Sequence, residues 1–254
     1  MRKKYFFFDV DGTLACGLTT RMPESAKRCV AQLRANGHFT ALATGRLQAS
    51  AAEVAARYGF ADFVADGGYS LTLDGKLVEM HGLPVADCIA FIDRLEAAGI
   101  PWAVSVTNER VCITSDARYL AITPDDYFPT RVDPSFDYHQ IRQIYKVNFA
   151  CTPEKEHTID FGGLPTVRYN HDVLFIEPTE KQRGIRRMLD VLGAKDEDAV
   201  VFGDGTNDLC MFGQGWFSIA MGNACDALKA KADYITDPVD QDGLWNACKH
   251  FGWI

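Results

Sequence analysis

Two carboxylates separated by one residue follow a short aromatic run near the start of the chain. Residues 5–8 are Tyr-Phe-Phe-Phe, and Asp9, Val10, Asp11 and Gly12 come next. An apolar run of this length is typical of a buried strand, and the glycine predicts a turn at its end. One carboxylate can act as a nucleophile while the other transfers a proton. An isolated Asp-Gly pair is also common in surface turns, so the rest of the chain has to decide between these roles.

Polar residues also follow two later strand patterns. Residues 40–43 lead into Thr44, and residues 200–202 lead into Gly203 and Asp204. In open α/β sheets, sites form outside the carboxyl ends of the strands, so we expect the three strands to deliver their polar residues to one crevice. With an ammonium from the expected domain junction, the candidates are Asp9, Asp11, Thr44, Lys181, Asp204 and Asp208.

This set contains four carboxylates and few other ligands, which favours a hard cation. Mg²⁺ takes few protein oxygens, keeps several waters and often bridges to phosphate. Phosphoryl transfer needs an in-line nucleophile, neutralised phosphoryl oxygens and proton handling at the leaving oxygen. Because Asp9 and Asp11 can meet the first and last of these needs, the set predicts phosphoryl-transfer chemistry.

Four segments together resemble a known family. In order, they are residues 9–14 (DVDGTL), 44–46 (TGR), Lys181 and 203–208 (GDGTND). They resemble the four motifs of the haloacid dehalogenase-like (HAD) phosphatases. The insertion between the second and third motifs is similar to the α+β cap, class IIB, of the Cof-type branch. Two C-terminal segments also resemble that branch, namely residues 221–224 (MGNA) and 232–236 (ADYIT).

The resemblance implies a role for each matching residue. Asp9 would be the nucleophile, and Asp11 would be the general acid/base. The phosphate ligands would be Thr44, Gly45, Lys181 and Asn207. The Mg²⁺ ligands would be the carboxylates of Asp9 and Asp204 and the backbone carbonyl of Asp11. Asp208 would either bind the ion directly or support one of these ligands. The implied activity is Mg²⁺-dependent hydrolysis of a small phosphorylated metabolite through an aspartyl-phosphate intermediate, with a sugar phosphate as the expected substrate class.

Two other functions remain open at this point. A phosphotransferase or phosphomutase on the same fold would return the phosphoryl group to a sugar instead of water. A non-catalytic, phosphate-binding regulatory protein would need no proton chemistry, so the presence of both Asp9 and Asp11 argues against it. For Thr44, an N-cap of the helix that follows it is a second role, which is compatible with phosphate binding.

Three positions near the motifs have no settled role. Arg46 can make an ion pair that stiffens its loop or contact phosphate directly. Asp66 stands where relatives commonly have Asn, and we expect it to make a turn. The glycine that often follows the third-motif lysine comes three positions after it, at Gly184.

The elements that must position these residues follow an α/β pattern at both ends of the chain. We expect a Rossmann-like, mostly parallel sheet core formed by residues 1–82 and 181–254, with an inserted α+β cap at 83–180. In the core we expect strands at 5–8, 39–43, 63–65 and 199–202, helices at 24–36, 48–58 and 181–192, and a hairpin at 71–78 that turns at Asp74 and Gly75. In the insert we expect helices at 85–98 and 153–161, strands at 102–106, 110–114, 144–150, 166–170 and 173–176, and an irregular segment around 125–134.

Composition limits the partners. The 254 residues are 47% hydrophobic and carry a formal net charge of −8, so we expect no nucleic-acid partner. No apolar run is long enough to span a bilayer or to serve as a secretory signal, so we expect a cytoplasmic protein without a membrane partner. The eight cysteines show no metal-binding spacing and are expected to be reduced. The sequence does not indicate an oligomeric state.

Overall fold

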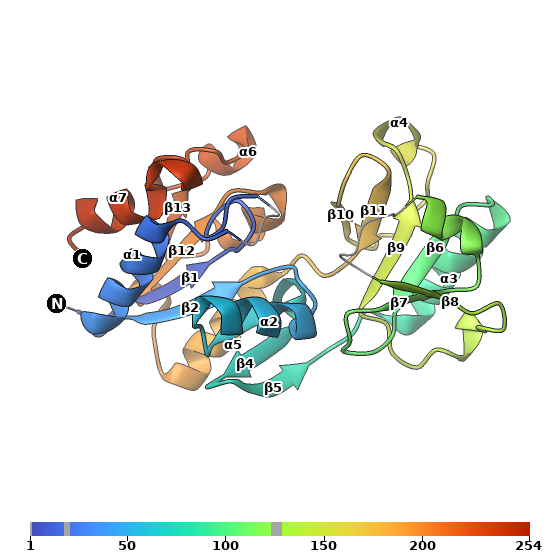
Figure 1. Ribbon diagram of the computed structural model, residues 1–254, viewed down its shortest axis with the longest axis horizontal. Coiled ribbons are helices and arrows are strands. Elements are labelled where there is room, and N and C mark those ends of the chain that lie inside the picture. Colours follow the sequence, from blue (N-terminus) through green and yellow to red (C-terminus); the bar gives the residue numbers. More distant parts are fainter. Residues whose placement is uncertain (1, 18–20, 123–128) are drawn as a thin grey trace. The chain divides into compact units, whose positions relative to one another are not determined.

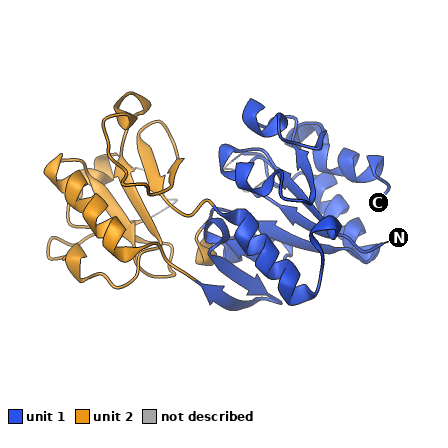
Figure 2. Cartoon of the chain, turned by 180° about the vertical axis from the view of Figure 1, so that it is seen from behind, with its two compact units in different colours: residues 1–46, 51–80, 180–254 blue, residues 47–50, 81–179 orange. Residues whose placement is uncertain are grey.

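The structure, a computed structural model, describes residues 2–17, 21–122 and 129–254. Its ribbon is shown in Figure 1. The chain divides into two compact units, coloured separately in Figure 2: unit 1 contains residues 1–46, 51–80 and 180–254, and unit 2 contains residues 47–50 and 81–179. Two acidic residues of the expected irregular segment, Asp125 and Asp126, lie outside the described residues.

Unit 1 is built on an eight-stranded sheet with the order β14-β13-β12-β1-β2-β3-β4-β5. Neighbours from β14 to β3 are parallel, and β4 and β5 are antiparallel additions at one edge. The strands are β1 (Tyr5–Phe8), β2 (Phe39–Ala43), β3 (Phe63–Ala65), β4 (Ser70–Leu73), β5 (Lys76–Met80), β12 (Ala199–Gly203), β13 (Phe217–Ala220) and β14 (Tyr234–Ile235). The predicted mixed α/β class with a mostly parallel core is confirmed.

Helices cover both faces of this sheet because its central strand is apolar on both sides. Phe6 and Phe8 are completely buried with α1, α2 and α7, whereas Phe7 is buried on the other face with α5 and α6. Burying such a side chain contributes about 1.5–3 kcal/mol. The helices are α1 (Glu24–Ala35), α2 (Gln48–Tyr58), α5 (Lys181–Leu192), α6 (Asp226–Lys229) and α7 (Gly243–His250). The helix expected at 24–36 buries the predicted face, which consists of Ala26, Cys29, Val30 and Leu33.

The predicted hairpin joins β4 to β5. Asp74 and Gly75 both have positive φ, at 49° and 70°, as a two-residue hairpin turn of this type requires. A second tight turn, η1 (Asp66–Gly68), follows β3. Asp66 therefore makes a turn, as expected, with φ of 49° and its N–H donating to the Arg46 carbonyl.

Unit 2 contains a six-stranded sheet with the order β10-β11-β9-β6-β7-β8. Its pairs are antiparallel except for β7 and β8. The core between this sheet and α3 is apolar, and it includes Trp102 and Phe149. The elements are α3 (Val85–Ala97), β6 (Trp102–Ser105), β7 (Cys112–Thr114), η2 (Ala117–Ala121), β8 (Thr130–Val132), η3 (Tyr138–Gln140), β9 (Lys146–Ala150), α4 (Pro153–Glu156), β10 (Thr166–Arg168) and β11 (Val173–Ile176).

Two predictions in this unit were wrong. The segment expected to be irregular contains β8, which pairs with β7 although its sequence shows no apolar alternation. The helix expected at 153–161 ends at Glu156. The Thr158 hydroxyl donates to the Lys155 carbonyl at 2.6 Å, and this bond competes with continuation of the helix.

All eight cysteines are free. Within the described part of the chain, no helix has the length and apolar character needed to cross a membrane.

Candidate active site

The carboxyl ends of β1, β2 and β12 are aligned at one edge of the unit 1 sheet. Phe8 pairs in register with both Leu42 and Phe202, so the three strands end at the same level. The Asp9 N–H extends this pairing by donating to the Phe202 carbonyl at 3.0 Å. Because the parallel strands end together, the polar residues that follow them lie at the same edge of the sheet, where the sequence predicts a shared crevice.

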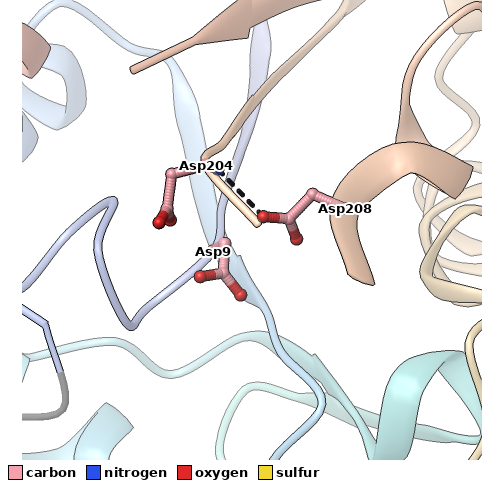
Figure 3. Close-up of side chains that lie close together, drawn as sticks. All are labelled: Asp9, Asp204 and Asp208. Atoms are coloured by element: carbon pink, nitrogen blue, oxygen red, sulfur yellow. Dashed lines mark hydrogen bonds between the residues drawn. The ribbon is translucent and has the colours of Figure 1, made fainter. Parts of the chain in front are cut away.

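Three carboxylates from two of these loops lie close together at this edge, as Figure 3 shows. One oxygen each of Asp9, Asp204 and Asp208 lies within 4.8 Å of the others. Asp9 follows β1, Asp204 follows β12, and Asp208 lies in the short helical segment η5 (Thr206–Met211). Asp9 and Asp208 are buried, and Asp204 is partly buried.

The Lys181 ammonium compensates part of this charge. Its side chain is only 1% exposed, and Nζ lies 2.6 Å from both Asp9 Oδ1 and Asp208 Oδ1. Lys181 is the first residue of α5, where a cation is poorly matched to the helix dipole. The carboxylates of Asp9 and Asp208 therefore stabilise a positive charge that the N-terminus of α5 disfavours.

Burial and charge crowding shift the pKa values of this cluster. Burial raises the pKa of Asp9 well above its usual value, and repulsion from Asp208 adds to this although Lys181 opposes it. Burial likewise raises the pKa of Asp204 to about 7, against the hydrogen bond from Thr13. For Lys181, burial alone would lower the pKa, but attraction to Asp208 and Asp9 outweighs it and the pKa is raised. With all three carboxylates ionised, the cluster would carry an excess of negative charge, and the raised pKa values of Asp9 and Asp204 reflect this cost.

Asp208 is engaged on both carboxylate oxygens by donors of the chain. Oδ1 accepts from Lys181, and Oδ2 accepts from the backbone N–H groups of Asp204 and Gly205, both at 2.9 Å. Asp208 thereby fixes the lysine and the loop that carries Asp204. Gly203 makes this possible, because a Cβ there would lie 2.8 Å from the Asp208 Cβ.

Asp11 lies outside this group of three and pairs with Arg46. Arg46 Nε donates to Oδ2 at 2.8 Å, and Nη2 donates to Oδ1 at 2.7 Å. The Asp11 side chain is 24% exposed and the Arg46 side chain is 10% exposed, so the pair lies nearer to solvent than Asp9 and Asp208. Of the two roles considered for Arg46, the structure shows the ion pair.

Three potential phosphate ligands keep donors available. The Thr44 hydroxyl oxygen accepts from the Arg46 N–H at 3.1 Å and can still donate its own proton. The N-cap role considered for Thr44 is wrong, because α2 begins at Gln48 and its N-cap position is therefore Leu47. Neither the Gly45 N–H nor the Asn207 side chain donates a hydrogen bond to any of the described residues.

The first loop packs directly against the loop of Asp204. Gly12 has φ of 92°, and a Cβ there would lie 2.1 Å from Asp204 Oδ2. The Thr13 hydroxyl donates to Asp204 Oδ1 at 2.7 Å. Thr13 was not assigned a role from the sequence, although it lies within the first motif. Its contact shows that both loops must be placed together for the carboxylates to meet.

A cavity of about 410 Å³ opens beside these loops within unit 1. It is large enough for a small molecule next to Asp11 and Asp204, and three of its lining residues are acidic. Its lining consists of Asp11, Gly12, Cys16, Gly17, Asp204, Asn223, Val239 and Asp240.

A family model described as haloacid dehalogenase-like hydrolase matches residues 6–248. The chain belongs to this family. The resemblance inferred from the four motifs is confirmed, as is the prediction of an enzyme. The mixed α/β fold described above matches that of a solved structure of this family.

Relatives share both units of the chain. The solved structure of a HAD subclass IIB sugar phosphatase, BT4131, has a TM-score of 0.81 at 26% identity and covers 99% of this chain and 100% of its own. Pyridoxal phosphate phosphatase YbhA of Escherichia coli is 26% identical over 273 residues, covering 96% of this chain and 97% of its own. A Streptococcus pyogenes protein, provisionally named a bifunctional phosphatase/peptidyl-prolyl cis-trans isomerase, is 30% identical over 99% of this chain, which spans 54% of that protein's length.

The donor set fits a divalent metal ion. Three carboxylates face one ammonium, which leaves two negative charges in a mostly buried cluster. All available ligands are hard oxygens, and no His or Cys belongs to the group among the described residues. This chemistry suits Mg²⁺, which prefers carboxylate oxygens and water.

Proposed function

We propose that this protein is a Mg²⁺-dependent phosphatase that hydrolyses a small phosphorylated metabolite through an aspartyl-phosphate intermediate. The observation that carries the proposal is the buried group of Asp9, Asp204 and Asp208 around Lys181, with Asp11 two residues from Asp9. Pure phosphate binding would not need a second carboxylate beside the first. The arrangement therefore favours chemistry over binding alone.

In the proposed first step, an Asp9 oxygen attacks phosphorus and the bond to the leaving oxygen breaks. Asp11, in its protonated form, donates a proton to that oxygen. In the second step, Asp11 takes a proton from water, the water oxygen attacks phosphorus, and the Asp9 carboxylate is released. For both steps, Asp11 must exchange its bidentate bond with Arg46 for a contact with the leaving oxygen or with water.

The phosphoryl oxygens would be held by the donors that the structure leaves available, together with Lys181. These donors are the Thr44 hydroxyl, the Gly45 N–H and the Asn207 amide. Lys181 also offsets the charge of Asp9, which would otherwise repel the phosphate. Holding the group in line for attack provides much of the catalysis in this chemistry.

A bound Mg²⁺ would neutralise the charge that Asp9 and the phosphoryl group bring together. The ligands would be the carboxylates of Asp9 and Asp204 and the backbone carbonyl of Asp11. Asp208 would act beside them, because its oxygens already accept hydrogen bonds from Lys181 and the Asp204 loop. Such supporting contacts orient metal ligands and are costly to remove.

For the substrate, we propose a sugar phosphate, supported by the similarity to BT4131. Pyridoxal phosphate is the second candidate, supported by the similarity to YbhA along nearly the whole chain.

We further propose that residues 1–82 and 181–254 form the catalytic core and that residues 83–180 form the cap domain that selects the leaving group. We also propose that the protein acts in the cytoplasm and has no nucleic-acid partner, which its formal net charge of −8 disfavours.

The test is release of inorganic phosphate from an aryl phosphate and from a panel of sugar phosphates and pyridoxal phosphate, with Mg²⁺ or with EDTA. We expect Mg²⁺-dependent release that Asp9→Asn removes while the circular dichroism spectrum stays unchanged. Asp226→Asn is the matched control, because Asp226 is exposed in α6 outside the site. Absence of release across the whole panel would exclude the phosphatase, and full activity of Asp9→Asn would exclude Asp9 as the nucleophile.

A phosphotransferase is distinguished by adding free sugars to the same reaction. A phosphatase produces inorganic phosphate in an amount equal to the substrate consumed. A phosphotransferase would instead accumulate a new sugar phosphate at the expense of inorganic phosphate. Product analysis by ³¹P NMR measures both at once.

A further inference from the structure

One short turn in unit 1 is hydrogen-bonded to the loop that carries Asp204. The turn comprises residues 221–225 and directly follows β13. The Met221 N–H donates to the Gly203 carbonyl at 3.0 Å, and the Cys225 N–H donates to the Asp204 carbonyl at 2.9 Å. Two backbone bonds therefore fix the turn against the end of β12.

The side chain of Asn223 extends the same turn to the loop of Asp9 and Asp11. Asn223 Nδ2 donates to the Gly12 carbonyl at 2.8 Å. Its Oδ1 accepts from the Val239 N–H at 2.9 Å, so the amide group is used on both sides. The turn is also held to the C-terminal segment through the Gly222 N–H, which donates to the Asp237 carbonyl at 3.1 Å.

The contact with Gly12 matters because that residue has little freedom to move without disturbing Asp204. A Cβ at Gly12 would overlap Asp204 Oδ2, so the two loops are already as close as glycine allows. The loop is closed by its own bonds, in which the Gly12 N–H donates to Ala15 and the Leu14 N–H donates to Val10. A shift of the Gly12 peptide would therefore move Asp11 and the carboxylate cluster relative to each other.

We propose that Asn223 is a positioning residue for the reaction: it holds the Gly12 peptide and thereby fixes the first loop against the loop of Asp204. The proposal rests on the function proposed above. Asparagine suits the position because it offers one donor to Gly12 and one acceptor to Val239 from the same group. Aspartate would keep the acceptor and lose the donor, and serine is too short to reach both partners.

The first test separates the two hydrogen bonds. Asn223→Asp keeps the bond from Val239 and removes the one to Gly12, and the neutral Asn223→Ser removes the reach to Gly12 without adding charge. We expect kcat to fall roughly 10- to 100-fold in both variants, with KM changed less than threefold, since a misplacement of about 1 Å can cost about 100-fold. Unchanged kcat in both variants would overturn the proposal.

The matched control is Asn246→Ser, the same neutral substitution as Asn223→Ser in the same C-terminal segment. Asn246 Nδ2 donates to Asp237 Oδ2 at 2.8 Å and does not contact the first loop. We expect its kcat to equal that of the parent chain. If Asn246→Ser lost as much kcat as Asn223→Ser, the effect would be a general loosening of the C-terminal segment, and the proposal would be wrong.

A second readout needs no turnover. Amide hydrogen exchange of Leu14 and Ala15, whose N–H groups bond to Val10, reports how firmly the first loop is held. We expect at least tenfold faster exchange in both Asn223 variants and none of this change in Asn246→Ser. Unchanged exchange would overturn the proposal even if kcat fell. Faster exchange in a protein that hydrolyses no phosphate would support the positioning role and reject the proposed function.

Discussion

Replacing Lys181 with methionine should destabilise unit 1 by about 3–5 kcal/mol, the usual cost of removing one partner from a buried ion pair. The ammonium is 1% exposed and lies 2.6 Å from two carboxylate oxygens, so no water can replace it without opening the core. Methionine fills a similar volume, which keeps the packing term small. The loss should therefore come from Asp9 and Asp208, which are left without their shared cation.

The assay is urea unfolding at pH 7 in EDTA, followed by tryptophan fluorescence. Three of the four tryptophans lie in unit 1, so the signal reports mainly on the unit that contains the site. The matched control is Lys27→Met. Lys27 makes an exposed pair with Glu24 at 3.1 Å, and exposed pairs contribute about 0–1 kcal/mol.

A double variant tests whether the loss has the proposed cause. Asp208→Asn removes one of the two negative charges, so Lys181→Met combined with Asp208→Asn should lose less free energy of unfolding than the two single variants together. Contacting charges commonly show a coupling of about 0.5–3 kcal/mol. A loss below about 1 kcal/mol for Lys181→Met, or strict additivity with Asp208→Asn, would refute the reasoning.

Two further predictions concern the carboxylate cluster. Gly12→Ala should lower turnover about 100-fold or more, because its Cβ would lie 2.1 Å from Asp204 Oδ2. Gly37→Ala is the control, because Gly37 has a similar φ of 85° but open space around it, and it should leave turnover unchanged. Equal kinetics of the two variants would contradict this prediction. In EDTA, the Tm should decrease as the pH is raised from 4 to 8. Folding raises the pKa of Asp204 to about 7 and also raises the pKa of Asp9. The folded state therefore binds these protons more tightly than the unfolded state, which stabilises the fold at low pH. This contribution is lost as the pH rises through the pKa values of the folded state. Asp204→Asn should show a flatter Tm profile by scanning fluorimetry, and an identical profile would disprove the assignment.

The core elements could be predicted because their apolar patterns are local and strong. β1 is buried on both faces, and α1 buries one apolar stripe, so the sequence of each segment predicts a strand or a helix without knowledge of its neighbours. β8 could not be predicted in this way, because its residues are only half-buried or exposed and it depends on pairing with β7. α4 was overestimated because the pattern extends past Glu156, while the side chain of Thr158 ends the helix.

The candidate site could be located from the sequence, but the partner of each side chain could not. Strand ends predict which edge of the sheet receives a residue. They do not predict that Lys181 bonds to Asp9, 172 positions away, or that both oxygens of Asp208 are occupied by donors of the chain. Such contacts depend on rotamers and on loops far apart in sequence, which a single chain's pattern does not encode.

The spacing of Asp9 and Asp11 gains its meaning from the turn that follows β1. In a continuing strand, residues two apart point to the same face and would meet the same partners. Here β1 ends at Phe8 and the chain turns at Gly12, with φ of 92°. Asp9 is consequently buried and bonded to Lys181, while Asp11 lies nearer to solvent and is bonded to Arg46. In the proposed mechanism, Asp9 attacks phosphorus and Asp11 exchanges Arg46 for the leaving oxygen, so the different positions of the two carboxylates match the two roles that we propose.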